Sequence, residues 1–324
     1  MEHILSQYVD GFDGQKTTIN GYDGYKKGID TYFIIPNENN EEVLLEQKAL
    51  SDFMLVHGVD HFTTPIFSKS GYLLTLHQKK EYMVCCGRPL QGHRPEHPGT
   101  LLAHFHHLGS QYPYEPVLIS SYGQWASLWT EKLAAFERIY SKQWAERPVT
   151  KFQRLFVDTF PYLIGLTENA LQYLEETEKD WRYHEADRGT VCFQRYEHQL
   201  EQSVIWPHDI VYDHPARDIA EYIRPYFLQE EDDCFQLLRV FIQEYEQVKQ
   251  LSIFSWRLIY ARLLLPIHLF DCLEEGFSYK DTEPVYQSYH SLLMKSRVYE
   301  SNLKRFFQEM GLSKEETNIP SIDW

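Results

Sequence analysis

Histidines are concentrated in one stretch of the sequence and could form a metal site. Eight of the 15 histidines fall between residues 57 and 107. His104 and His107 are three residues apart, a spacing that puts both imidazoles on one face of a helix, and His93 or His97 could complete a zinc site. The HExxH pattern is absent, however, and no carboxylate stands at helical ligand spacing beside these histidines. We therefore predict no metal site, with zinc binding as the alternative.

Cys192 is the cysteine whose sequence neighbours best suit nucleophilic chemistry. A cysteine nucleophile needs a base beside its thiol, and His198 or His208 could supply one. A buried, unreactive thiol is the commoner state of a free cysteine, and we predict that state for Cys192. The five cysteines include no CxxC pair, so the sequence indicates neither a disulfide framework nor a zinc knuckle.

The charge balance argues against nucleic acid and membranes as partners. Lys and Arg total 31 against 47 Asp and Glu, a formal net charge of -16, which repels phosphate backbones and anionic lipid surfaces. No stretch approaches the roughly 20 apolar residues of a membrane span, and residues 1–10 lack the apolar core of a signal peptide. We therefore expect synthesis in the cytoplasm.

The first part of the chain, residues 1–92, reads as short strands and turns around one helix. Apolar residues at helical spacing predict that helix over about 42–57. Residues 66–67 and 72–76 read as the two strands of a hairpin, and residues 81–86 as another strand. This pattern predicts a small β-rich lobe.

Residues 93–324 read as a mainly helical lobe, interrupted by a non-helical section over about 189–215. The predicted helices cover residues 99–108, 123–144, 152–179 with a break at Pro161, 216–226, 231–250, 252–275 and 284–310. A β-rich lobe followed by a helical lobe indicates an α+β fold.

Three segments carry a resemblance to a known group of enzymes. Residues 70–92 resemble the lobe-connecting strands and linker of the aminoglycoside phosphotransferase and choline kinase group. Leu101-Leu-Ala-His-Phe-His106 resembles its LAxxH helix, and Arg217-Asp218-Ile-Ala220 resembles its RDLA segment. The resemblance implies the two-lobed protein-kinase-like fold. Within the group, the chain most resembles spore coat proteins of the CotS type, and among them it is most similar to the YutH type.

The phosphate-binding lysine that the resemblance implies is missing. It should lie on the strand before the first helix, but no Lys or Arg occurs between Lys27 and Lys48. Ile35 or Pro36 takes its place. Lys48 could approach from the helix, although a solvated helix face is the usual position of such a lysine.

The catalytic loop of the group, H-x-D-x-x-x-x-N, is altered at all three functional positions. Phe193 replaces the His, Arg195 the base Asp, and Leu200 the metal-binding Asn, and no Asn occurs anywhere between residues 169 and 302. An arginine stays protonated and cannot accept a proton, so general-base catalysis is lost unless Glu197 substitutes.

The second metal ligand of the group is also missing. Counting back from Asp218 by the family's spacing leads to Trp206 instead of an aspartate. Asp209 could be a displaced ligand, but a lone carboxylate without the Asn partner is a weak magnesium site. A capping or solvated role is the more ordinary one for Asp209.

These residues lead to one preferred function and two alternatives. The resemblance together with the missing groups predicts an inactive kinase-like spore coat protein, without a cofactor, that is made in the mother cell and assembled with other spore coat proteins. The first alternative is an active small-molecule kinase with relocated groups, namely Glu197, Asp209 and Lys48. The second is a scaffold that binds a nucleotide or small ligand without turnover.

Overall fold

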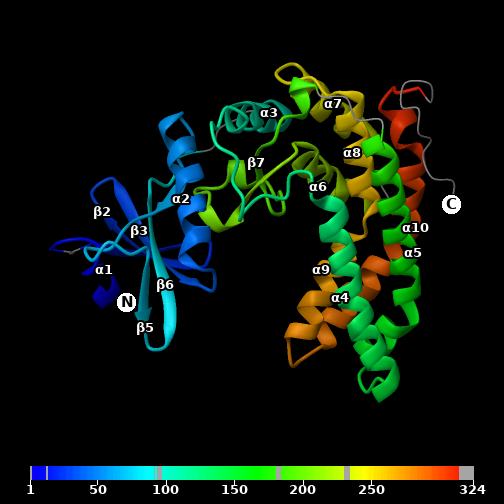
Figure 1. Ribbon diagram of the computed structural model, residues 1–324, viewed down its shortest axis with the longest axis horizontal. Helices are drawn as coiled ribbons and strands as arrows, with labels where there is room; N and C mark the ends of the chain where they lie inside the picture. The colour runs from blue at the N-terminus through cyan, green and yellow to red at the C-terminus, as the bar shows by residue number, and fades with distance from the viewer. Residues whose placement is uncertain are drawn as a thin grey trace. The chain divides into compact units, whose positions relative to one another are not determined.

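The chain forms two compact units in a computed structural model. The model describes residues 2–11, 14–90, 92, 97–179, 184–229 and 234–313. The first unit comprises residues 1–120 and 189–213, and the second comprises residues 121–188 and 214–324. The lobe boundary at residue 92 stays a prediction. The predicted α+β class is confirmed, with a small antiparallel sheet early in the chain and helices through most of the rest (Figure 1).

An antiparallel sheet forms the centre of the first unit. Its strands run in the order β1-β2-β3-β6-β4, and β5 also pairs with β6. The strands are β1 (Gln15–Ile19), β2 (Tyr22–Lys27), β3 (Asp30–Asn37), β4 (Thr63–Pro65), β5 (Leu74–His77) and β6 (Lys80–Gly87). Asn20 and Gly21, with φ of 49° and 81°, make the two-residue turn between β1 and β2. This Asn-Gly turn matches the twist of a hairpin, so it fixes the register of the two strands.

The predicted hairpin of residues 66–67 and 72–76 is wrong. Strands β4 and β5 each pair with β6, and not with one another. The tight turn lies instead at Gln78 and Lys79, whose φ angles of 49° and 64° join β5 directly to β6. Residues between β4 and β5 make a loop in which the amide of Ser68 donates to the carbonyl of Tyr72, at 2.8 Å.

Helices and a second hairpin complete the first unit. They are α1 (Glu2–Leu5), α2 (Glu41–Val56), α3 (Pro98–Gly109), β7 (Thr190–Phe193), η2 (Gln199–Glu201), η3 (Pro207–Asp209) and β8 (Ile210–Asp213). Asn40 caps α2 by accepting the amide of Val43 at 3.0 Å. A Cβ on Gly109 would lie 2.7 Å from the backbone nitrogen of Val191, so the absence of a side chain lets α3 lie directly against β7.

The second unit is helical. Its elements are α4 (Trp125–Glu146), α5 (Lys151–Lys179), η1 (Glu185–Asp187), α6 (Ala216–Phe227), α7 (Cys234–Glu246), α8 (Ile253–Leu264), α9 (Ile267–Ser278) and α10 (Glu283–Glu309). Helix α5 packs against α4, α8 and α10 (Figure 1). Apolar residues of α5 such as Phe156 and Phe160 are fully buried there.

The structure corrects two predictions about helices that contain a proline. The predicted break at Pro161 is wrong, because α5 continues through it as one helix. The predicted helix over 252–275 is instead two helices, α8 and α9, divided at Pro266. Leu265, just before this proline, has the extended conformation (φ -63°, ψ 122°) that a following proline favours.

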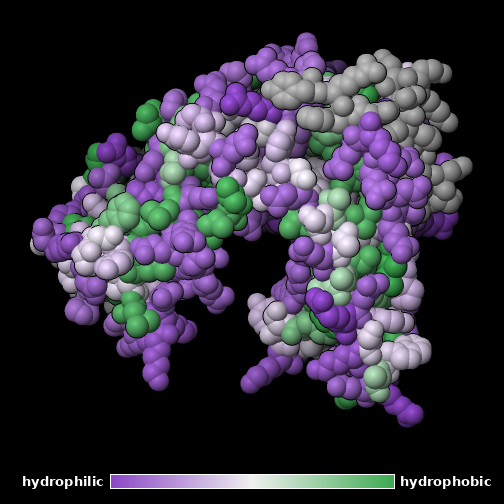
Figure 2. Space-filling view, in the orientation of Figure 1, coloured by the Kyte–Doolittle hydropathy of each residue, from purple (hydrophilic) through white to green (hydrophobic). Residues whose placement is uncertain are grey.

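The surface and helix lengths add two general observations. In the view of Figure 2, hydrophilic side chains cover most of the surface and apolar ones form separate, smaller patches. Among the described residues, no single helix has the length and apolar composition to cross a bilayer, and α8 and α9 reach that composition only as a bent pair.

Candidate functional site

The β7–β8 hairpin of the first unit carries the loop that the sequence predicts to be a degenerate kinase catalytic loop. Phe193 ends β7 and is fully buried, at the position where the group has histidine. Its ring stacks on Phe105 of α3, with 5.0 Å between ring centroids and an interplanar angle of 18°. The ring of Tyr196 also lies against it, with centroids 5.4 Å apart. The position therefore contributes apolar packing and no acid or base.

Arg195 and Leu200 are the residues predicted at the base and metal positions of that loop. The guanidinium of Arg195 donates to the backbone carbonyl of Gln194 at 2.7 Å, and Gln199 donates to the carbonyl of Arg195 at 2.7 Å. Leu200 is only 4 % exposed. A cationic guanidinium and a buried isobutyl group cannot accept a proton or bind magnesium.

Trp206 lies in an apolar cluster with the strand that would carry the phosphate-binding lysine. Its indole is 3 % exposed and meets the ring of Phe33 edge-on, with centroids 4.8 Å apart. Ile35 of the same strand belongs to the same cluster. The buried members are Phe33, Ile35, Leu44, Leu73, Met83, Cys85, Val204 and Trp206. Trp206 therefore contributes apolar packing at the position where the sequence predicts that a metal-binding carboxylate has been lost.

Tyr22 and His208 close the polar side of the Trp206 cluster. The Tyr22 ring meets Trp206 edge-on at 4.9 Å, and its hydroxyl lies 3.1 Å from Nε2 of His208. Burial lowers the pKa of His208 to about 4. His208 is therefore neutral at pH 7 and supplies no positive charge for a phosphate.

Gly24 of β2 makes room for the ring on which Trp206 rests. A Cβ at this position would lie 2.7 Å from Cδ1 of Phe33. We expect Gly24→Ala to lower the free energy of unfolding of the first unit by about 1–3 kcal/mol, because Phe33 cannot retreat from Trp206. Urea denaturation measures this effect.

Gly165 provides a matched control for that substitution. It lies within α5, and a Cβ there would meet nothing within 4 Å. Gly165→Ala should leave stability unchanged or raise it by up to about 1 kcal/mol. Equal effects of the two substitutions would show that contact with Phe33 does not constrain Gly24.

Asp209 and Glu197 are close enough to influence one another electrostatically. Burial, and secondly the charge of Glu197, raise the pKa of Asp209 from 3.8 to about 6. The folded protein therefore holds a proton on Asp209 between pH 4 and 6 that the unfolded chain releases, so this group makes folding less favourable as the pH rises through that window.

Asp209→Asn should remove this pH dependence. We expect its free energy of unfolding, relative to that of the original protein, to rise between pH 4 and pH 7 by on the order of 2 kcal/mol. Urea denaturation of both proteins at pH 4, 5, 6 and 7 provides the measurement. A difference that stays constant with pH would contradict the raised pKa.

Two charged residues of α2 turn toward other partners. Lys48 forms an ion pair with Asp52 at 3.0 Å and lies over the ring of Phe67. Glu46 accepts three backbone amides through its carboxylate, those of residues 117, 118 and 119, at 2.8–3.0 Å. Both side chains therefore help to fix the structure around α2.

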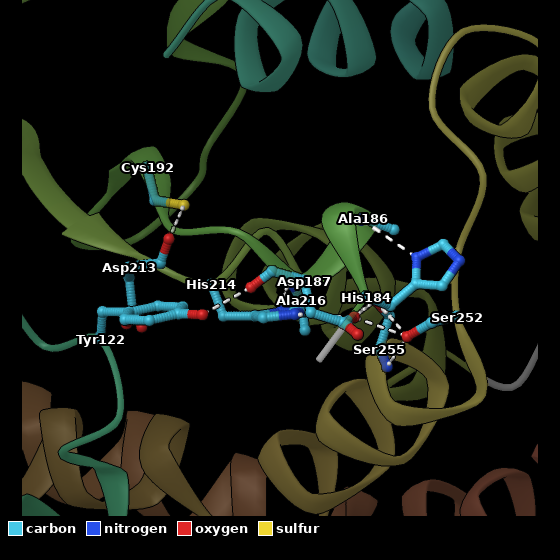
Figure 3. Close-up of polar contacts among 10 residues, drawn as sticks. All are labelled: Tyr122, His184, Ala186, Asp187, Cys192, Asp213, His214, Ala216, Ser252 and Ser255. Atoms are coloured by element: carbon cyan, nitrogen blue, oxygen red, sulfur yellow. Dashed lines mark hydrogen bonds and ion pairs between the residues drawn. The ribbon is translucent and has the colours of Figure 1, made fainter. Parts of the chain in front are cut away.

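The imidazole beside the Cys192 thiol is that of His106, which replaces His198 or His208 as the candidate base. Sγ of Cys192 lies 3.9 Å from Nε2 of His106. Sγ also donates to the carbonyl of Asp213 at 3.8 Å (Figure 3). Both side chains are fully buried. A thiol that no substrate can reach agrees with the predicted unreactive state.

A cluster of Asp187, His214, Ser252 and Ser255 in the second unit has the residue types of a hydrolase triad (Figure 3). Both serine hydroxyls donate directly to Oδ1 of Asp187. His214 accepts the amide of Ala216 at Nδ1 and points Nε2 toward Oδ1 of Asp187, at 3.4 Å. The serine hydroxyls thus point to the carboxylate, whereas a Ser-His-Asp relay needs the serine hydroxyl to point to the imidazole. The cluster fixes the start of α8, where Ser252 is the N-cap.

The structure describes some but not all of the histidines named for the alternative zinc site. His93 lies outside them. His97 precedes the first turn of α3, whereas His107 lies in its last turn. His97 and His107 therefore lie at opposite ends of a 12-residue helix, and His97 does not complete a site with His107.

The assignment of Phe193, Arg195, Leu200 and Trp206 as degenerate cleft positions stays a prediction. So do the alternative roles of Glu197, Asp209 and Lys48. Glu197 and Asp209 are close enough for the charge of Glu197 to raise the pKa of Asp209. Lys48 forms its ion pair with Asp52 instead.

Structural comparison shows the fold of small-molecule kinases. An aminoglycoside phosphotransferase from Alicyclobacillus acidocaldarius matches with a TM-score of 0.64 and 13% sequence identity, over 96% of each chain. A microcompartment-associated aminopropanol kinase matches with a TM-score of 0.56 and 11% identity, over 96% of this chain and 98% of that one. At such low identity the likeness concerns the fold alone.

Sequence comparison identifies the family of the chain as well as its fold. Residues 2–306 match the family described as "Spore coat putative kinase YutH". A Bacillus subtilis protein named "Endospore coat-associated protein YutH" is 34% identical over 299 residues, which cover 90% of this chain and 88% of that protein. The chain therefore belongs to the YutH family of spore coat proteins, which has a kinase-like fold.

Proposed function

We propose that this protein is a catalytically inactive, kinase-like component of the spore coat that acts in coat assembly. Its family and the name of its Bacillus subtilis relative support the location. We further propose that it is made in the mother cell and binds other spore coat proteins, and that nucleic acid and membranes are not its partners.

The position of Trp206 is the main support for the proposed lack of catalytic activity. Phosphoryl transfer needs a lysine and a metal-binding carboxylate to face one another across the nucleotide phosphates. We assign Ile35 or Pro36 and Trp206 to the corresponding positions, and Ile35 and Trp206 pack in one apolar cluster with Phe33. Binding a phosphate there would require burying its charge against hydrocarbon.

The proposed location in the spore coat can be tested in a sporulating host. A fluorescent fusion of the full chain should gather at the forespore surface, and the untagged protein should appear in extracts of the purified spore coat. Uniform fluorescence in the mother cell, together with absence from coat extracts, would contradict a coat component.

A second candidate is an active kinase with relocated groups, and the state of Asp209 is the observation that favours it. A partly exposed carboxyl group with a pKa of about 6 suits a general base near neutral pH. Glu197 beside it and Lys48 on α2 would be the other relocated groups.

A measurement of kinase turnover distinguishes the inactive coat protein from the active kinase. We expect no phosphorylation of amino alcohols or aminoglycosides above background with magnesium and radiolabelled ATP. The relocated-group kinase instead requires turnover that Asp209→Asn abolishes and that Asp281→Asn, a change at an exposed loop carboxylate, leaves intact.

A further inference from the structure

A cavity in the first unit is lined by four histidines that come from two separate segments. Its volume is about 380 Å³. His57 and His61 follow the end of α2, and His104 and His107 lie on α3. Clustering of imidazoles around one cavity is the arrangement that binds transition metals in proteins.

The electrostatics of this cavity favour a cation. Helix α2 ends at Val56 and α3 ends at Gly109, and residues from both helix ends line the cavity. The C-terminal end of a helix carries a partial negative charge. No Lys or Arg is found among the described residues that line the cavity, so nothing there offsets this charge.

His57 already has the tautomer of a metal ligand. Its Nδ1 lies 2.7 Å from the backbone carbonyl of Phe53. Because a carbonyl can only accept, Nδ1 carries the proton and Nε2 keeps a lone pair. Metal-binding histidines commonly donate their second ring nitrogen to a carbonyl in this way.

The four imidazoles are not yet gathered around one point. Among the described residues, no three of their ring nitrogens lie within 4.8 Å of one another. His104 and His107 are exposed and can change rotamer, His107 by giving up the 3.1 Å contact of its Nε2 with Gln111. His57 keeps its hydrogen bond to Phe53, and His61 is 4 % exposed.

We propose that this cavity binds one divalent transition-metal ion of the class that prefers imidazole, such as Zn²⁺, through three or four of its histidines. The ion would tie the C-terminal ends of α2 and α3 together. Leu200 also lines the cavity, and Phe105, another lining residue, stacks on Phe193. Metal binding would therefore stabilise the loop that replaces the kinase catalytic loop, and it is independent of nucleotide binding.

Zinc calorimetry on the full chain without a histidine tag tests this proposal. The original protein should bind one Zn²⁺ per chain. The double variant His57→Gln/His104→Gln should bind it at least about tenfold more weakly. The matched control, His77→Gln/His290→Gln, removes two histidines outside the cavity and should bind as the original protein does.

Circular dichroism of each variant checks that the fold is retained, and the single variant His104→Gln serves if the double variant unfolds. Copper electron paramagnetic resonance of the original protein gives an independent count, with three or four nitrogen ligands expected. Equal zinc affinity of the cavity variant and the control variant would overturn the proposal, as would fewer than three nitrogen ligands.

Discussion

Trp206→Ala is expected to lower the free energy of unfolding of the first unit by about 3–5 kcal/mol, the usual cost of removing a large buried aromatic side chain. The indole is 3 % exposed and contacts both Phe33 and Tyr22, so its loss leaves a cavity bounded by rigid rings. Urea denaturation followed by intrinsic fluorescence and circular dichroism measures the change.

Trp144 offers the matched control for this substitution. It lies on α4 and is 67% exposed. Trp144→Ala should change stability by less than about 0.5 kcal/mol, because it leaves no cavity behind. A loss below 1 kcal/mol for Trp206→Ala would show that the apolar cluster does not depend on the indole.

Trp206→Asp extends the same experiment. It introduces the acidic residue that the resemblance predicts for an active kinase at this position, but it buries a carboxylate among Phe33, Ile35 and Met83. We therefore expect it to destabilise the first unit at least as much as alanine does. Tolerance of aspartate would mean that the site keeps room for a metal, which favours the kinase alternative.

Glu221→Ala is the second substitution for which we expect a large effect. Glu221, Arg224 and Arg262 form a buried ionic network in the second unit, each less than 8 % exposed. One carboxylate oxygen lies 3.2 Å from Nε of Arg224, and the other lies 2.8 Å from Nη2 of Arg262. Removing Glu221 leaves two guanidinium groups without their carboxylate, at an expected cost of about 3–5 kcal/mol in the free energy of unfolding.

The control for Glu221 is an ion pair near the surface of the same unit. Arg239 and Glu309 lie 3.0 Å apart with side chains 44% and 31% exposed. Glu309→Ala should cost less than about 1 kcal/mol, because water solvates the charges that remain. Differential scanning calorimetry compares the two variants, and equal melting temperatures would contradict the importance of the buried network.

Local signals in the sequence were sufficient for most helices. The helix predicted over about 42–57 is α2, because its apolar stripe and the cap at Asn40 act within a few residues. Prolines were harder to interpret. Pro161 is held within α5 by packing on both sides of it, whereas Pro266 divides α8 from α9. Whether a proline ends a helix depends on tertiary contacts as well as on its own ring.

Strand pairing and the site depended on contacts that no local pattern carries. Strand β6 pairs with β3 and with both β4 and β5, although the sequence favoured pairing between the two strands before it. Motif spacing drew attention to Trp206, but its contact with Phe33, far away in the chain, could not be predicted from spacing. The same holds for His106 beside Cys192 and for His57 in the cavity with His104.

Calorimetric titration of the full chain with ATP in millimolar magnesium tests the central claim most directly. We predict no measurable heat of binding and no rise in melting temperature, because Trp206 and Ile35 leave the phosphates without a lysine or a bound metal. Binding without magnesium would indicate a ligand-binding scaffold. Saturable, magnesium-dependent ATP binding would contradict the inactive, kinase-like function proposed for this protein.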